Sequence, residues 1–306
     1  MVLIALLGLV LAGCGDDDGR AAPRQAATPT ATATPTPAAA PDPDAALPSG
    51  AADLASELVR TREALYAAID EWRATGDPGR GGPPAAVAAP AVIEQRIYRR
   101  LGRRPSLARR VLRALPSSLR GEARDNVLAR SELSKIVSVR NGPPPRIAIG
   151  RAAPADVLRS HYRRAWRRFR VGPPLLAAVN FVESGFGRLR NRSVSGARGP
   201  MQFMPATWAA YGLGGDISDP RDAILGAANY LRAGGGRADL RGALFHYNPS
   251  TRYVDAVLRY ARVIERDPDA YLALHSWQVY VRTATGAQRL TGPGTTVPST
   301  RVASAA

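Results

Sequence analysis

The sequence is poor in the side chains that build disulfide bonds and metal centres. Its 306 residues include one cysteine and three histidines, so no disulfide bond can form within the chain. The spacing of His161, His246 and His275 matches no common ligand pattern of a zinc site. We therefore expect no metal ion and no cofactor, and a chemistry that other residue types perform.

Lysine is nearly absent as well, because Lys135 is the only one in the chain. The formal net charge of +17 therefore comes from arginine. An excess of this size favours anionic partners: nucleic acid, anionic lipid or the acidic polymers of a cell wall. The arginines are spread over several segments and not gathered in one arm with interleaved aromatic residues, which argues against nucleic acid. A GC-rich genome would also explain most of the excess without any partner.

Long apolar runs are missing too. Residues 2–11 are too few to span a bilayer, but they fit the apolar region of a signal peptide. The Leu-Ala-Gly sequence before Cys14 resembles the lipobox of bacterial lipoproteins. This resemblance implies that residues 1–14 are a lipoprotein signal and that a lipidated Cys14 anchors the protein to the outer face of the cell membrane. The alternative is an ordinary secretory signal with an incidental cysteine. Since no basic residue precedes the apolar run, we expect translation to start further upstream.

Composition and periodicity divide the next part of the chain. Residues 15–50 form a Pro/Thr/Ala tract with almost no large apolar side chains, which predicts a disordered linker acting as a tether or stalk. Residues 51–150 predict a helical accessory segment. Its helices are expected at 53–74, 91–101, 106–114 and 119–137, with a Gly/Pro linker at 76–90. We interpret its arginines as a solvated face and not as a binding site, among them Arg99, Arg100, Arg103 and Arg104.

Residues 151–270 predict a second group of helices, and residues 271–306 a C-terminal extension. Helical periodicity and start signals place these helices at 154–170, 205–211, 222–232, 240–247 and 252–266, around a central helix that begins at Pro173. Residues 277–281 alternate like a strand and, with a turn at Thr285-Gly286, predict a small β-hairpin before a disordered tail. The expected fold class is all-α.

The central helix ends on a carboxylate. Its apolar residues recur at helical spacing: Leu175, Leu176, Val179 and Val182. Glu183 lies on the same side of the helix, and Gly185 supplies a stop. Desolvation and the negative end of the helix dipole would both favour the protonated form of Glu183, as a general acid requires. The alternative is an amphipathic helix whose last glutamate has already turned to solvent.

Three segments of the chain carry a shared pattern: Glu183-Ser184-Gly185-Phe186, the stretch from Ser193 to Pro205 with its Gly-Pro-Met-Gln-Phe-Met-Pro run, and His246-Tyr247-Asn248. In this order they resemble the signature motifs of lytic transglycosylases. The resemblance covers about residues 155–265, and its Met-Gln-Phe run is also similar to the membrane-bound type B enzymes. It implies an all-α, goose-lysozyme-like SLT fold that cleaves peptidoglycan glycan strands.

The resemblance also implies a mechanism with one carboxylate. Most glycosidases use two, but here Glu183 stands alone, since Asp219 and Asp222 are typical of a turn and a helix start. Glu183 would protonate the oxygen between N-acetylmuramic acid and N-acetylglucosamine. It would then deprotonate the muramoyl 6-hydroxyl, which closes onto C1 as a 1,6-anhydro ring while the substrate's N-acetyl group stabilises the intermediate.

Further roles follow from the resemblance, residue by residue. Ser193, or Ser195 in its place, would lie beside the carboxylate and contact the sugar. Met201, Gln202 and Phe203 would form the cleft wall that holds the N-acetyl sugar, although Met201 and Phe203 equally fit a plain core. Tyr247 would hydrogen-bond Glu183, and Asn248 would contact the sugar. The chain departs from the family at Pro200, where leucine is common, and at Pro249-Ser250, where Ala-Gly is common.

The leading interpretation is therefore a peptidoglycan lytic transglycosylase in the cell envelope, outside the cytoplasm. Its expected partners are the glycan strands and, through the lipid anchor, the membrane. A muramidase on the same fold and a non-catalytic wall-binding lipoprotein remain as alternatives. Nucleic-acid binding conflicts with the export signal.

Overall fold

The computed structural model describes residues 40–136, 147–193, 195–283, 286–290, 294–296 and 300–301. These residues belong to one compact unit that spans 39–306. The predicted signal peptide, Cys14 and residues 15–39 of the predicted linker lie outside the described residues. Residues 40–50 of that linker are described, and the prediction of disorder is wrong for them, because Arg96 and Arg100 donate hydrogen bonds to the backbone carbonyls of Pro43, Ala45 and Pro48. Among the residues described, no helix is long and apolar enough to cross a membrane.

The N-terminal part of the unit is helical. It consists of α1 (Ala51–Thr75), α2 (Ala85–Arg103), α3 (Pro105–Ala114) and α4 (Ser117–Ile136). The predicted linker at 76–90 is wrong in its second half, because α2 begins at Ala85 and contains Pro90. Proline inside a helix removes a hydrogen bond. Burial of Val87 and Ala91 on the same helix compensates for that loss, since neither side chain is exposed.

Seven helices follow between residues 155 and 276 of the described chain. They are α5 (Ala155–Phe169), α6 (Pro173–Ser184), α7 (Pro205–Tyr211), α8 (Pro220–Ala233), α9 (Leu240–Tyr247), α10 (Thr251–Arg266) and α11 (Pro268–Ser276). The first six match their predicted positions closely, whereas α11 was not predicted. Asp267 caps α11 and Pro268 opens it, but Ala270 to Ser276 are all buried. A helix buried on every side has no amphipathic period to recognise.

The short strands form two small antiparallel sheets. β2 (Val279–Thr283) pairs with β3 (Gly286–Leu290), which also pairs with β5 (Thr300–Arg301). The β2–β3 pair is the predicted hairpin, and Thr285 of its predicted turn lies outside the described residues. The second sheet, β1 (Ile147–Ile149) with β4 (Gly294–Thr296), was not predicted. All-α remains the correct fold class.

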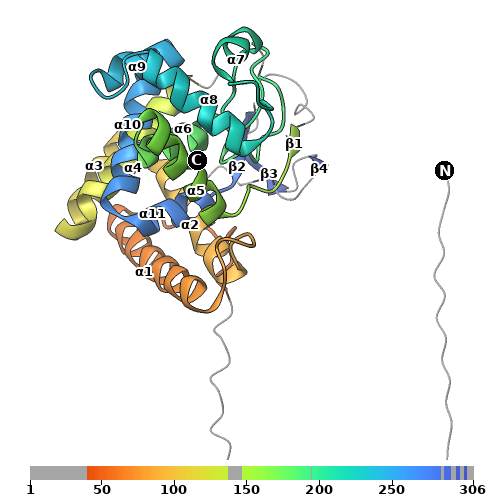
Figure 1. Cartoon of the computed structure of the whole chain (residues 1–306). Helices are drawn as coiled ribbons and strands as arrows, with labels where there is room; N and C mark the ends of the chain where they lie inside the picture. Colours follow the sequence, from red (N-terminus) through yellow and green to blue (C-terminus); the bar gives the residue numbers. More distant parts are fainter. Residues whose placement is uncertain are drawn as a thin grey trace, which may run out of the picture. The chain divides into compact units, whose positions relative to one another are not determined.

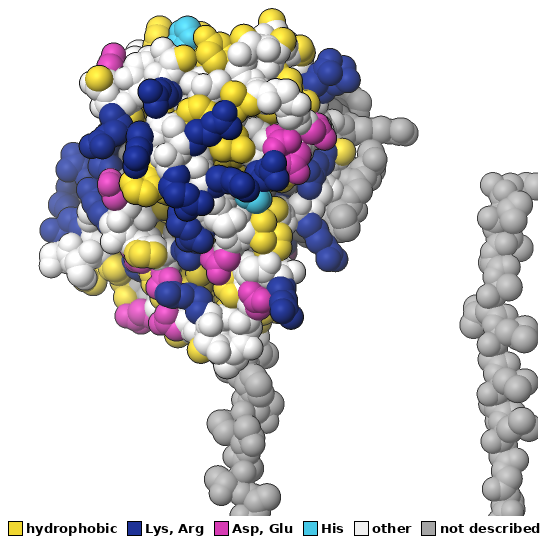
Figure 2. All heavy atoms as spheres, in the orientation of Figure 1, with side chains coloured by type: hydrophobic (Ala, Val, Ile, Leu, Met, Phe, Trp, Pro, Cys, Tyr) yellow, Lys and Arg dark blue, Asp and Glu magenta, His cyan; other side chains and the backbone are white. Residues whose placement is uncertain are grey.

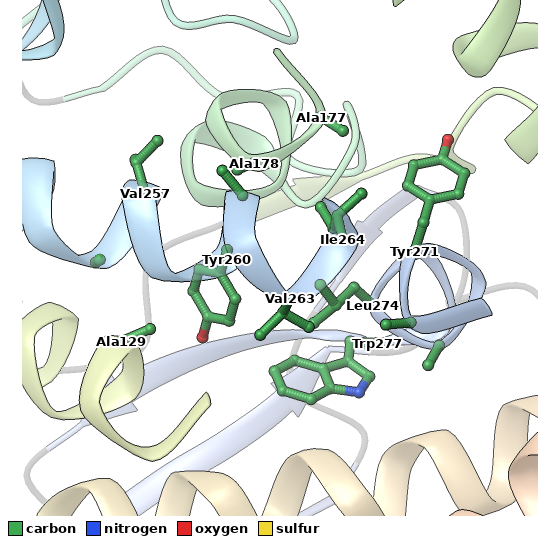
Figure 3. Close-up of a cluster of buried hydrophobic side chains, with 14 of the residues drawn as sticks. Ala129, Ala177, Ala178, Val257, Tyr260, Val263, Ile264, Tyr271, Leu274 and Trp277 are labelled. Atoms are coloured by element: carbon green, nitrogen blue, oxygen red, sulfur yellow. The ribbon is translucent and has the colours of Figure 1, made fainter. Parts of the chain in front are cut away.

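One continuous core joins the accessory helices to the helices that follow. The helix α10 lies between α4 and α6, while α2 packs on both α4 and α11 (Figure 1). In this core, Ala177 and Ala178 of α6 lie on one side of α10, and the ring of Tyr260 on α10 points to the other side, near Ala129 of α4 (Figure 3). Residues 51–136 therefore form part of the body that carries Glu183.

An ion-pair cluster reinforces the contact between α4 and α10. The carboxylate of Asp125 on α4 accepts hydrogen bonds from three arginines of α10, Arg259, Arg262 and Arg266, at 2.9–3.0 Å. On the face shown in Figure 2, basic side chains are scattered over the surface, and acidic side chains gather mainly at its lower end and at one side. The Asp125 cluster shows that some of the basic excess has a structural role.

Candidate active site

The helix α6 presents Glu183 in its last turn. Gly172 and Pro173 start the helix, and the proline suits the first position because its missing N–H needs no partner there. Leu176 and Val179 have no exposed surface, so one side of the helix is fixed in the core. Gly185 adopts the left-handed conformation, at φ 60°, and ends the helix. Glu183 is consequently held partly buried at a rigid helix end.

The environment of Glu183 favours a proton at neutral pH. Burial raises the pKa of Glu183 to about 7, and a hydrogen bond from Tyr253 opposes this rise. The Tyr253 hydroxyl donates to Oε1 of Glu183 at 2.6 Å. The predicted hydrogen-bond partner was Tyr247, and on this point the prediction is wrong. The carboxyl has the pKa expected of a general acid near pH 7.

Tyr247 forms its hydrogen bond with the neighbouring loop and not with Glu183. Its hydroxyl donates to the backbone carbonyl of Met201 at 2.5 Å. Tyr247 is nevertheless close to the acid, since burial and then the charge of Glu183 raise the pKa of Tyr247. The sequence placed Tyr253 in the apolar register of its helix, and nothing in that register signals which of two nearby tyrosines reaches the carboxyl.

The loop before α7 is hydrogen-bonded to the end of α6. The Ser184 hydroxyl donates to the carbonyl of Pro200 at 2.5 Å and accepts the N–H of Gly187 at 2.8 Å. Gly199 has a φ of 75°, and a Cβ atom there would lie 1.9 Å from the carbonyl oxygen of Ile217. Only glycine fits this approach. The first and second motifs therefore contact each other through the side chain of Ser184 and the backbone carbonyl of Pro200.

The predicted wall residues differ in what they expose. The Met201 side chain has no exposed surface and that of Phe203 has 3%, so both are part of the core and offer almost nothing to a ligand. The Phe203 ring packs on Trp208 and Tyr247. Gln202 is half-buried, and its amide donates to the carbonyl of Gly199 at 2.9 Å. The burial of both side chains agrees with the alternative interpretation, in which Met201 and Phe203 are residues of the hydrophobic core.

Ser193 and Asn248 are both accessible. The Ser193 hydroxyl accepts the N–H of Ala197 at 3.0 Å, so it closes a turn and does not bond Glu183. Ser195, the alternative to it, is exposed. Asn248 follows the last residue of α9, and its N–H donates to the carbonyl of Leu244 at 2.9 Å. Sugar contacts by Ser193 and Asn248 stay predictions.

Glu183 lines a cavity of about 330 Å³. The wall includes Val182 and Gly185 of the acid's own segment, together with side chains of α2, α4 and β2. Arg99 and Arg103 are among them. Arg99 is half-buried, so the prediction of a solvated face is wrong for this arginine, whereas Arg103 is exposed, as that prediction expects. The sequence could not show this, because the wall arises only where α2 and α4 pack against the end of α6.

Arg188 is a residue of the site that the sequence did not single out. Its guanidinium, which is buried, donates to the carbonyls of Gly185 at 2.9 Å and His275 at 2.6 Å. Burial lowers the pKa of Arg188 to about 10. The side chain therefore links the turn after Glu183 to the end of α11 and fixes the direction in which α6 ends.

Comparison with known families gives a match over residues 161–267 to the family described as "Transglycosylase SLT domain". The matched range contains Glu183, Tyr247 and Tyr253, and it leaves out α1 to α4, α11 and the hairpin. No solved structure matches the chain.

Proposed function

Since residues 161–267 belong to the transglycosylase SLT family, of the lysozyme-like superfamily, we propose that this protein is a peptidoglycan lytic transglycosylase. The bond cleaved is the β-1,4 linkage from N-acetylmuramic acid to N-acetylglucosamine, and the product carries a 1,6-anhydromuramoyl end. The observation that carries the proposal is a single carboxyl with a pKa of about 7, hydrogen-bonded to Tyr253 and placed on a cavity.

In the first step, Glu183 acts as the acid. Tyr253 donates to Oε1, so the proton of the neutral carboxyl resides on Oε2. Oε2 transfers this proton to the glycosidic oxygen as the bond to C1 breaks, and N-acetylglucosamine leaves as an alcohol. The N-acetyl oxygen of the muramoyl residue shares the positive charge that develops at C1.

In the second step, the same group acts as the base. The carboxylate of Glu183 removes the proton of the muramoyl 6-hydroxyl as that oxygen bonds to C1, which restores the acid and closes the anhydro ring. Of the residues that line the described cavity, Glu183 is the only acidic one. A mechanism that uses one carboxyl group therefore fits this cavity better than the usual glycosidase mechanism, which uses two.

The test is mass spectrometry of the muropeptides that the purified protein releases from cell wall. We expect anhydromuramoyl ends, and we expect Glu183→Gln to lower their rate of formation about 100- to 10,000-fold, because the acid proton is lost. Glu71→Gln, an exposed site on α1, is the matched control. Reducing muramoyl ends would identify a muramidase instead, and unchanged wall with the native protein would favour the wall-binding alternative.

We also propose that the protein acts at the outer face of the cell membrane, held by a lipidated Cys14. The support is the apolar run before Leu-Ala-Gly-Cys14 and the absence of any other cysteine. Mass spectrometry of the mature N-terminus and membrane fractionation of Cys14→Ala cells test this location. Release of the variant from the membrane is the expected result, and equal membrane retention would contradict it.

A further inference from the structure

Arginines from α2 and α4 form one wall of the cavity that holds Glu183. We propose that Arg99 and Arg130, with Arg103 beside them, form a subsite for a carboxylate on the peptide stem of the glycan strand. This inference rests on the proposed function, because it names the part of the same polymer that the cavity takes. All three arginines lie outside the family match at 161–267.

Arg99 is held in a fixed orientation without being neutralised. Its guanidinium lies 4.0 Å from the ring centroid of Tyr280, another residue of the cavity wall. Stacking on an aromatic ring orients the guanidinium and leaves its N–H groups free to bind an anion at the edge. Arg99 is half-buried, so the charge lies in the wall and not on a mobile surface side chain.

Two positive charges of the wall, those of Arg99 and Arg130, are not balanced by a carboxylate of the described residues. Among the described residues, neither Arg99 nor Arg130 forms an ion pair, whereas Arg259 and Arg262 share the carboxylate of Asp125. Nε of Arg130 is buried and has no hydrogen-bond partner in that part of the chain. Burial, followed by the charge of Arg130, holds the pKa of Arg99 well below its usual value. An anionic ligand would offset both costs.

The arginines line the same cavity as Glu183 and do not perturb its pKa. Burial and the Tyr253 hydrogen bond account for the pKa of Glu183, with no contribution from an arginine. A guanidinium in contact would stabilise the carboxylate and lower that pKa. The cavity thus combines an acid that keeps its proton with a wall that attracts a negative group, and one ligand can occupy both ends.

The chemistry of the polymer identifies the anion. In peptidoglycan the lactyl carboxyl of each muramoyl residue is bound as an amide to the peptide stem, so the free carboxylates of an intact strand lie on the stems. An amidase that removes the stem leaves the lactyl carboxylate on the sugar, so stems with amidated carboxylates are the comparison that removes the stem charge alone. Planar guanidinium groups match a carboxylate in shape and charge. Binding a stem at the arginine wall while Glu183 reaches the adjacent glycosidic bond makes stem-bearing strands the preferred substrate.

The experiment compares stem-bearing glycan strands with strands whose stems have been removed by an amidase. For the native protein we expect kcat/KM to be at least about 10-fold higher on stem-bearing strands. In Arg99→Gln and Arg130→Gln we expect this ratio to fall about 10-fold, mainly through KM, because binding is lost and the chemical step is not. Stems with amidated carboxylates should behave like stripped strands.

Arg124→Gln, an exposed position on α4, is the matched control and should keep the native ratio. An equal loss on both substrates in the cavity variants would indicate a structural role, and an unchanged ratio would show that the wall binds no stem. Either result overturns the inference, while cleavage of stripped strands by the native protein keeps the proposed function intact. Calorimetric binding of free stem peptide to the Glu183→Gln protein tests the subsite without any cleavage, and no binding there also overturns it.

Discussion

The hydroxyl of Tyr253 and the Oε1 atom of Glu183 are joined by a 2.6 Å hydrogen bond between α10 and α6. This bond favours the carboxylate, while burial favours the neutral acid and dominates. The two opposing effects leave the pKa of Glu183 at about 7, the value at which one group serves as acid and base in turn.

Removal of that bond should shift the pH dependence of the reaction. In Tyr253→Phe the carboxylate loses a donor, so the pKa of Glu183 rises further above its ordinary value. We expect the alkaline limb of the pH–rate profile to move upward by about one pH unit, with a loss of about 10-fold in kcat. Tyr247→Phe, which loses a bond to Met201 instead, should leave the position of that limb where it is. A limb that moves equally in both variants would contradict the assignment.

The folded protein should become less stable as Glu183 ionises. Its folded pKa of about 7 exceeds the ordinary glutamate value of 4.5, so the folded state binds more protons than the unfolded state between these pH values. The free energy of unfolding must then fall as pH rises through this window. Glu183→Gln removes this contribution, and its melting temperature relative to the native protein should increase from pH 4.5 to pH 8. A difference in melting temperature between the variant and the native protein that stays constant with pH would contradict this prediction.

Glu94 should behave in the same way at a position remote from the chemistry. It is buried on α2, accepts a 3.2 Å hydrogen bond from Trp277 and has a pKa raised to about 7 by burial and then by the charge of Glu122. Ionisation above pH 7 costs folding energy, so Glu94→Gln should raise the free energy of unfolding at pH 8 by on the order of 1–3 kcal/mol. Glu63→Gln, exposed on α1, should change it by less than about 0.5 kcal/mol. Urea unfolding at pH 5 and pH 8 checks both, and a Gln variant less stable than the native protein at pH 8 would disprove the expectation.

Asp125 should show the opposite pH dependence. Burial opposes its ionisation, but the hydrogen bonds from Arg262 and Arg259 prevail and hold the pKa of Asp125 below its usual value. The stabilisation is present above the unfolded pKa and is lost as pH falls through the folded one. Asp125→Asn should cost about 2–4 kcal/mol at pH 7, because it leaves three arginines without their carboxylate.

Asp255, which pairs with Arg241 on the surface, supplies the comparison for Asp125. Asp255→Asn should cost less than about 1 kcal/mol, since water screens an exposed pair. Chemical denaturation measures both variants. Equal costs at the two sites would mean that the Asp125 cluster does not hold α4 to α10.

The parts of the fold that could be predicted are those with local signals. The helices α7 and α9 were placed at their observed bounds, because a Met-Pro start marks α7 and a Tyr-Asn-Pro end marks α9. The helix α11 has such a start at Asp267-Pro268, but its complete burial removed the periodic pattern that usually identifies a helix.

The position of Glu183 at the end of a buried helix was predictable from the sequence, and the contacts that surround it were less so. Glu183 follows from its place at the end of an apolar helix and from the three motifs. The choice between Tyr247 and Tyr253 depends on how α9 and α10 pack, which no local pattern encodes. For the same reason, Arg99 could not be distinguished from a solvated arginine before the position of α4 was known.

The hydrogen bond from Arg188 to the carbonyl of His275 limits how short a folded fragment of this chain can be. His275, Trp277 and the strand β2 all lie downstream of residue 267, where the family match stops. Excision of residues 161–267 alone would strip α10 of its partner α4 and leave the guanidinium of Arg188 without its second acceptor. We therefore expect a fragment that folds to reach from α1 to the hairpin, because the flanking segments share their core and their hydrogen bonds with the family domain.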